Sequence, residues 1–241
     1  VGEELGELVS RKTPVDIIIT PLVTIVAGGL FAKYCCSPIN DFMLYLGSVI
    51  NSATALSPFL MGVTVAVLVG CALTLPISSV AICVMLGIDG LAAGAATAGC
   101  CAQMIGFAVM SFPENKWGGL VSQGIGTSML QMGNIVKNPF IWIPPILSAA
   151  VTGPVATCLF HLQMNGSPVS SGMGTCGLVG QIGVYAGWVA DVAAGTKAGI
   201  TALDWIGLIL ISFILPAILT PLFAVPFRKA SLIKDGDMKL D

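Results

Sequence analysis

Long stretches without charge divide the chain into apolar segments of membrane-spanning length. Between Asp41 and Glu114 the only charged residue is Asp89, and none lies between Lys137 and Asp191. A helix needs about 20 apolar residues to cross the hydrocarbon of a bilayer. The pattern therefore predicts an all-α integral membrane protein, a polytopic helical bundle. Its clearest spans are expected over residues 15–34, 59–75, 91–112, 140–162 and 205–225.

Weaker segments separate these spans. Residues 41–57 and 118–137 mix apolar residues with uncharged polar ones, so each either lies flat at the interface or crosses the bundle. We expect 118–137 to be helical and to contact the second of two breaks described below. If it crosses the bundle it would line a solute pathway, because buried amides and hydroxyls need partners or water. Within 91–112 small residues recur every four positions, which favours a closely packed interior helix.

Two apolar runs end at the same short motif, Pro-x-Ser-Ser. It stands at Pro76-Ile77-Ser78-Ser79 and again at Pro168-Val169-Ser170-Ser171. Proline lacks a backbone N–H and disrupts a helix, while serine hydroxyls can bond the released backbone groups or a ligand. We predict two broken or re-entrant helices whose breaks approach each other near the membrane midplane, each opening a short helix. Alternatively, both prolines mark ordinary span ends at the water interface.

The order of these elements repeats along the chain. Units of about 41–112 and 118–200 each contain an amphipathic segment, a span, a Pro-x-Ser-Ser break and a segment rich in small residues. We expect an inverted repeat with eight crossings; if the amphipathic segments lie flat, there are six. The predicted transmembrane domain covers 14–227, between a polar surface segment at 1–13 and a polar basic tail at 228–241.

Basic residues at both ends predict the orientation. Arg11 and Lys12 precede the first span, and Arg228 and Lys229 follow the last. Because basic residues favour the cytoplasmic side, we expect both termini in the cytoplasm and a multi-pass protein of the cell inner membrane. We also expect a homo-oligomer in the lipid bilayer.

Composition excludes several classes of protein. Charged residues make up 9% of the 241 residues, against about 25% in a soluble domain. The net charge of −2 and the lack of a basic region argue against nucleic-acid binding. Asp89, Asp191 and the lone His161 are dispersed, so we expect no catalytic site, metal or cofactor. No Cys-x-x-Cys pair occurs among the eight cysteines, and we predict that Cys35 and Cys36 lie at a membrane boundary as free thiols.

Uncharged hydroxyls and amides are the candidate solute contacts. They can bind a neutral polyol without burying a charge, although each could equally form an interhelical hydrogen bond. The candidates, at the two breaks and in the polar segment, are Ser78, Ser79, Thr127, Ser128, Gln131, Asn134, Ser170 and Ser171.

Several of these residues belong to a recognisable pattern. Its parts are Pro76-Ile77-Ser78-Ser79, Gly126-Thr127-Ser128, Gln131-Met132, Asn134, Lys137-Asn138-Pro139 and a glycine-rich run at 166–180. Over residues 13–227 the chain resembles the phosphotransferase-system EIIC-like membrane proteins, the group that includes PfoR-type regulatory proteins. The resemblance implies a permease-like fold, sugar uptake coupled to phosphorylation, soluble phosphotransferase components as partners, and further sequence upstream of Val1.

The sequence also departs from the better-understood sugar permeases. Those place a membrane-embedded glutamate and histidine near the sugar, whereas no glutamate lies between Glu7 and Glu114 or after Glu114, and His161 stands alone. No phosphocarrier domain is recognisable in these 241 residues. We therefore expect a transporter rather than an enzyme, with a small polar solute such as a sugar or polyol bound between the two breaks. The alternative is a membrane-embedded ligand sensor or regulatory protein without transport.

Overall fold

The fold is known from a computed structural model. It describes Asp41, Tyr45 and residues 57–240. Internal contacts divide the chain into two units, residues 1–48 and 49–241, and the following account concerns the second. Several predictions lie outside the described residues: the span at 15–34, the polar segment 1–13, most of the segment 41–57, and the free thiols of Cys35 and Cys36.

Regular structure in the described part of the chain is helical, with no strand there. Four helices are long and apolar enough to cross a membrane: Gly90–Met110, Pro139–Leu159, Cys176–Ala193 and Ala202–Lys229. A shorter apolar helix, α3, covers Pro58–Thr74. The predicted all-α architecture is confirmed, and these helices agree with the spans expected over 91–112, 140–162 and 205–225.

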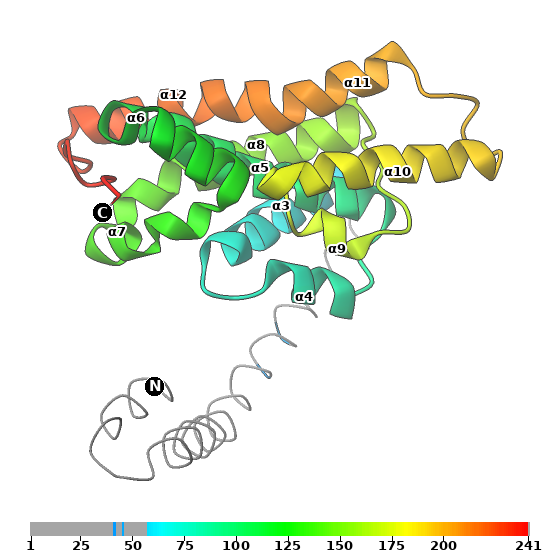
Figure 1. Ribbon diagram of the computed structural model, residues 1–241, viewed down its shortest axis with the longest axis horizontal. Coiled ribbons are helices and arrows are strands. Elements are labelled where there is room, and N and C mark those ends of the chain that lie inside the picture. The colour runs from blue at the N-terminus through cyan, green and yellow to red at the C-terminus, as the bar shows by residue number, and fades with distance from the viewer. Residues whose placement is uncertain (1–40, 42–44, 46–56, 241) are drawn as a thin grey trace, which may run out of the picture. The chain divides into compact units, whose positions relative to one another are not determined.

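Helix α5 (Gly90–Met110) runs through the middle of this unit (Figure 1). It contacts α3, α8 (Ile143–Pro154) and α12 (Leu215–Lys229). Of its most apolar stretch of 18 residues, 89% is buried inside the protein. The backbones of α5 and α3 touch, because a Cβ on Gly99 would collide with the carbonyl oxygen of Ala66. Small residues allow this close approach, so the predicted interior helix is confirmed.

Replacing Gly99 by alanine should destabilise the folded bundle. The added methyl group meets backbone rather than a flexible side chain. Helices α3 and α5 would have to move apart, which we expect to lower the free energy of unfolding by about 1–3 kcal/mol. Gly133→Ala is the matched control, because a Cβ there meets nothing within 4 Å. Thermal unfolding of the purified protein in detergent measures both, and equal stability of the two variants would contradict the packing described here.

Irregular turns interrupt the other spans. The one at Pro139–Leu159 begins with the 3-10 turn η3 (Pro139–Trp142), and Pro154 ends α8 before the π-helical turn η4 (Val155–Leu159). The last span consists of α11 (Ala202–Ile209), the π-helical turn η6 (Leu210–Ile214) and α12. Such turns occur where the regular ladder of helical hydrogen bonds is disturbed.

Helix α10 (Val179–Ala193) follows the glycine-rich run. With the 3-10 turn η5 (Cys176–Leu178) it forms the span that begins at Cys176, and Gly177 and Leu178 have positive φ where the two meet. Its glycines lie where other segments approach closely. A Cβ on Gly180 would collide with the carbonyl oxygen of Gly174, and one on Gly183 with the side chain of Ser170.

The polar segment 118–137 is helical only in pieces. Helix α6 (Phe112–Val121) passes into the π-helical turn η1 (Ser122–Gly126), and η2 (Ser128–Gln131) leads into α7 (Met132–Lys137). Between them Thr127 is extended, at φ −158° and ψ 143°. Its hydroxyl accepts a hydrogen bond from the N–H of Met129 at 3.2 Å, and such local bonds compete with helix. The expectation of one helix is therefore wrong at Thr127.

Candidate functional site

The two Pro-x-Ser-Ser segments lie against each other, and we call the pair the joined breaks (residues 76–79 and 168–171). The first leads into the short helix α4 (Ser79–Met85), the second forms α9 (Pro168–Ser171), and the two helices are in contact (Figure 1). Ser79 Oγ donates a hydrogen bond to the carbonyl oxygen of Gly172 at 2.8 Å. The predicted approach of the two breaks and the short helix at each are thus observed, while their place near the membrane midplane and the re-entrant course of the helices stay predictions.

The four serines of the joined breaks use their hydroxyls within the protein. Ser79, Ser170 and Ser171 are buried, and a buried hydroxyl needs a hydrogen-bond partner. Besides the Ser79 bond, the pairs are Ser78 Oγ with Ala81 N at 3.1 Å, Ser171 Oγ with Pro168 O at 2.7 Å, and Ser170 Oγ with Ser167 Oγ at 2.8 Å. In this conformation the hydroxyls therefore stabilise the two short helices and their contact.

Removing the Ser79 hydroxyl should weaken the joined breaks. Ser79→Ala leaves the Gly172 carbonyl without this donor, and we expect the free energy of unfolding to fall by about 1 kcal/mol. Ser122→Ala is a matched control, since its hydroxyl bonds only the nearby Gly119 carbonyl, at 3.3 Å. Its effect should stay within about 0.5 kcal/mol. Chemical unfolding in detergent compares the two variants. A Ser79→Ala protein as stable as the parent would show that the hydrogen bond from Ser79 to Gly172 does not stabilise the fold.

The polar segment reaches the chain just beyond the second break. Thr175 Oγ1 donates to the carbonyl oxygen of Gly124, in η1, at 2.6 Å. Turns η1 and η5 are also in contact. The contact shown is therefore with the chain four residues after Ser171, and contact with the second break itself stays a prediction.

A second polar cluster is buried where α3 ends. Gln103 Oε1, in α5, accepts hydrogen bonds from Thr74 Oγ1 at 3.2 Å and from Trp142 Nε1 at 3.1 Å. Ser128 Oγ lies 3.0 Å from Thr74 Oγ1, so this candidate belongs here. Gln103 Nε2 is buried with no hydrogen-bond partner among the described residues. This cluster was not predicted from the sequence, although Gln103 is the only amide side chain in residues 91–112 and a polar residue in an apolar span is a candidate for function.

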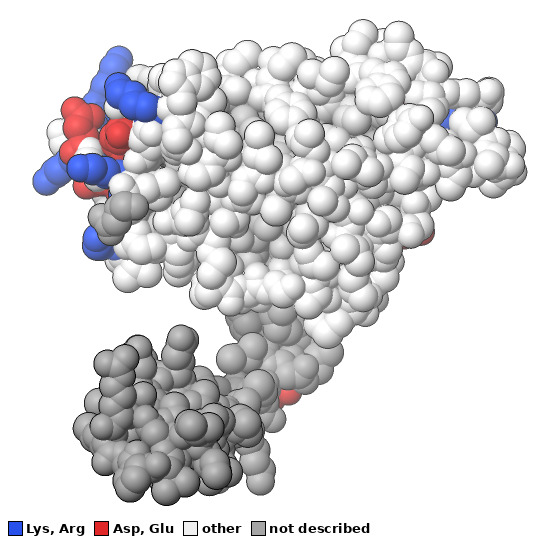
Figure 2. Space-filling model, viewed as in Figure 1, with Lys and Arg blue, Asp and Glu red and all other residues white. Residues whose placement is uncertain are grey.

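Gln131 and Asn134 bind the C-terminal tail. Their side-chain amides donate to the carbonyl oxygens of Met238 and Lys239, at 2.9 and 3.0 Å respectively. The Glu114 carboxylate accepts from the N–H of Met238 at 3.0 Å, and the Met238 side chain is fully buried. Charged side chains gather at this end of the unit (Figure 2). The tail is therefore packed against α6 and α7, and these two candidates lie in a different group from the serines.

Neutralising Glu114 should loosen the tail. Its carboxylate also accepts from the N–H of Gly236 at 3.2 Å, so Glu114→Gln weakens two bonds to the tail. We expect tryptic cleavage at Lys239 to accelerate about fivefold, which corresponds to losing roughly 1 kcal/mol. Asp235→Asn is the control, because that side chain is 97% exposed and does not adjoin the bond after Lys239. Mass spectrometry of timed digests measures the rates, and identical rates in both variants would rule out this anchoring role.

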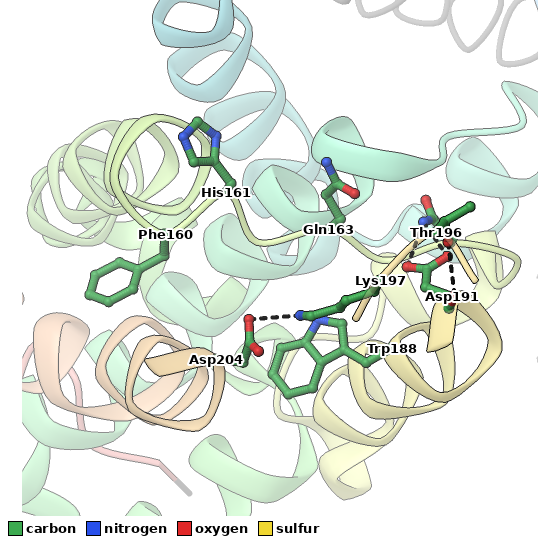
Figure 3. A pocket seen from close by; sticks show the side chains of 9 residues that line it. Phe160, His161, Gln163, Trp188, Asp191, Thr196, Lys197 and Asp204 are labelled. Atoms are coloured by element: carbon green, nitrogen blue, oxygen red, sulfur yellow. Dashed lines mark hydrogen bonds and ion pairs between the residues drawn. The ribbon is translucent and has the colours of Figure 1, made fainter. Parts of the chain in front are cut away.

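A polar cavity opens beside the second break. Its volume is about 350 Å³. Asn165 links it to the break, because it lies just before α9 and its backbone packs on Gly187 of α10. The lining residues, drawn in Figure 3, are Phe160, His161, Gln163, Asn165, Trp188, Asp191, Thr196, Lys197 and Asp204.

Charged side chains face one another in this cavity. Lys197 Nζ lies 2.7 Å from Asp204 Oδ1 and 4.9 Å from the centre of the Trp188 ring. Asn165 Nδ2 donates to both carboxylate oxygens of Asp191, at 2.9 and 2.8 Å. The cavity thus combines an aromatic ring, two carboxylates, an amide and an ammonium, which is the kind of lining that binds and orients a small polar ligand.

The sequence held a signal for this cavity. Asp191, Lys197 and Asp204 are the only charged residues in 138–227, and ionisable residues inside an apolar membrane chain are candidates for function. Asp191 and His161 are dispersed in the sequence, and the fold brings both to the lining of one cavity.

Among the metal-ligating side chains of the described ranges, no group of three or more His, Cys, Asp or Glu that could hold a metal ion occurs. The free cysteines there are Cys71, Cys83, Cys100, Cys101, Cys158 and Cys176.

Membrane-length apolar helices packed around a buried glycine-rich helix define a multi-pass integral membrane protein. The family model for the phosphotransferase system EIIC proteins matches residues 1–240. The chain belongs to this family, which implies a membrane location and a sugar substrate. The resemblance inferred from residues 13–227 is thus confirmed. Neither a curated protein nor a solved structure matches the chain.

Proposed function

We propose that this chain is a permease component that takes up a small polar solute, a sugar or polyol, for a phosphotransferase system. One observation carries the proposal: a cavity of about 350 Å³ with polar and aromatic lining stands beside the joined breaks. Sugar hydroxyls need carboxylate and amide partners, and the apolar face of a sugar ring packs on an aromatic side chain. The sugar substrate implied by the family fits the same chemistry.

The joined breaks are proposed as the part that moves. A side-chain bond between them, Ser79 Oγ to Gly172 O, contributes about 1 kcal/mol, so a solute that competes for these groups would help to separate α4 from α9. Short helices at corresponding breaks are typical of transporter binding sites. We keep Ser78, Ser79, Ser170 and Ser171 as proposed solute contacts once the breaks open.

The remaining candidates are proposed to line a continuation of the pathway. Thr127 and Ser128 lie beside the Gln103 cluster, and the unpaired Gln103 amide nitrogen offers a hydrogen-bond donor there. Gln131 and Asn134 continue the polar residues toward the charged end. Hydroxyls and amides along such a pathway can exchange hydrogen bonds with the hydroxyl groups of a sugar without adding unpaired buried charge of their own.

The order of the helices supports an inverted repeat. Helices α3, α4 and α5 run as an apolar helix, a short helix at the break and a second apolar helix, and α8, α9 and α10 run in the same order. Helix α3 contacts α8, and α4 contacts α9. We propose that the two halves exchange positions in alternating access. The end that carries Arg228 and Lys229 would face the cytoplasm, where soluble phosphotransferase components would dock. Association into a homo-oligomer remains part of the proposal.

Asp191→Asn tests the proposed site. The change keeps the size of the side chain and removes its charge, which weakens every hydrogen bond that a solute hydroxyl donates to it. Bonds to charged groups contribute roughly 1.5–3 kcal/mol, so we expect the uptake affinity to fall about tenfold or more. Uptake of labelled glucose or mannitol from the medium into vesicles that contain the purified protein measures the affinity. Asp235→Asn, at the exposed side chain of the charged end, should transport like the parent.

Measurements of flux and of binding together distinguish a permease from a ligand sensor without transport. Saturable uptake that Asp191→Asn impairs supports the permease. Binding by the isolated protein without uptake into vesicles would establish the sensor instead. Equal uptake by the Asp191→Asn and Asp235→Asn proteins would move the solute site away from the cavity.

A further inference from the structure

Lys197 already occupies a favourable position for a cation in the cavity. Its ammonium lies between the Trp188 ring and the Asp204 carboxylate (Figure 3), 4.9 Å from the ring centre and 2.7 Å from Oδ1. The Trp205 ring packs edge to face against the same Trp188 ring, with centres 5.8 Å apart. Because Trp188 is only 2% exposed, a ligand that uses its ring must take the place of the lysine.

A ligand that takes this place has to replace two interactions at once. Displacing the lysine leaves Asp204 without its ion-pair partner and Trp188 without its cation. A hydroxyl group offers a hydrogen bond but no charge to either residue. An ammonium group restores both the charge-assisted bond to the carboxylate and the attraction to the ring face. The position therefore selects an ammonium group over a hydroxyl group.

The charge balance of the cavity points in the same direction. Its lining includes one lysine and two aspartates, with His161 as the remaining titratable residue. The Asp191 carboxylate is bonded by the amide of Asn165, and no described lysine or arginine forms an ion pair with it. A second cation in the cavity would meet a carboxylate that is not yet neutralised.

Lys197 can leave this position by rotation of its side chain. The side chain is 27% exposed, so a path to water exists. Its backbone N–H is bonded to the carbonyl oxygen of Asp191 at 3.2 Å, which holds the backbone in place while the side chain moves. The exchange of one ammonium for another therefore needs no change in the helices.

We propose that the cavity binds a sugar-sized ring bearing a protonated amine, such as an amino sugar, whose ammonium displaces Lys197 from Asp204 and Trp188. The inference rests on the proposed function for the sugar ring and narrows its substrate class. Lys197 acts as an internal competitor that occupies the site until such a ligand arrives. A neutral sugar of the same size lacks the charge to displace it.

Calorimetric titration of the full purified chain with three sugars tests the selectivity. Glucosamine, glucose and N-acetylglucosamine are compared at one pH at which the glucosamine amine is protonated. We expect glucosamine to bind about tenfold more tightly than either neutral sugar, the ratio typical of one ion pair with a cation–π contact. Equal affinities for glucosamine and glucose would overturn the inference.

Two variants test the competition itself. Lys197→Met keeps a long apolar side chain without the ammonium and should raise the affinity for glucosamine about tenfold, because the internal competitor is gone. Lys234→Met, at an exposed lysine in the tail, is the control and should bind like the parent. Asp204→Asn should abolish the preference for glucosamine over glucose. A Lys197→Met protein with unchanged or weaker affinity for glucosamine would overturn the inference.

Uptake separates this inference from the proposed function. If glucosamine binds selectively but no sugar enters vesicles, the cavity assignment stands and the permease function fails. If vesicles take up glucose as readily as glucosamine, the permease function stands and the amine selectivity fails. Absence of glucosamine binding by both the parent and Lys197→Met overturns the inference.

Discussion

Backbone contact between α5 and its neighbours is the constraint on which the rest of this unit depends. Gly99 lets α5 touch the backbone of α3 at Ala66, and Gly174 lets the chain after the second break pack against α5 at Cys100. Dispersion forces between apolar side chains give little preference between a neighbouring helix and lipid, so close approach at small residues drives helix association in membranes. Since α4 follows α3 directly, this packing brings the two breaks to the same side of α5.

Polar groups released at the breaks then find partners inside the protein. Ser79 reaches the Gly172 carbonyl, and the Asp89 carboxylate, which caps α5, also accepts from the N–H of Gly166 at 2.9 Å. The loops before α5 and before α9 are joined again by paired backbone bonds between Gly90 and Met164. Because backbone groups in an apolar environment need such partners, the two halves stabilise each other's irregular segments. A solute that separates the joined breaks would have to supply comparable hydrogen bonds to the groups released there.

Elements with a strong local signal could be predicted from the sequence. The small-residue pattern of 91–112 predicted a buried helix, and α5 is buried as expected. The paired Pro-x-Ser-Ser motifs predicted two short helices in contact, which α4 and α9 are. The segment 118–137 was harder, because its polar residues match a helical period while the Thr127 hydroxyl bonds the nearby backbone instead. Periodicity reports which face a residue would occupy but does not report such local competition.

The sequence by itself determined the membrane class, the interior helix and the two Pro-x-Ser-Ser breaks, because these depend on local composition and on proline and glycine chemistry. The family resemblance could also be inferred from sequence motifs, and it agrees with the match of the family model over residues 1–240. The partners of the polar side chains were decided only by the tertiary structure. Gln131 and Asn134 bond a tail about one hundred residues away. Lys197 and Asp204 pair beside Trp188, and the Asp191 carboxylate bonds Asn165 in the lining of the same cavity. Hydrogen bonds and ion pairs act over a few ångströms in space, so no spacing along the chain could reveal these meetings.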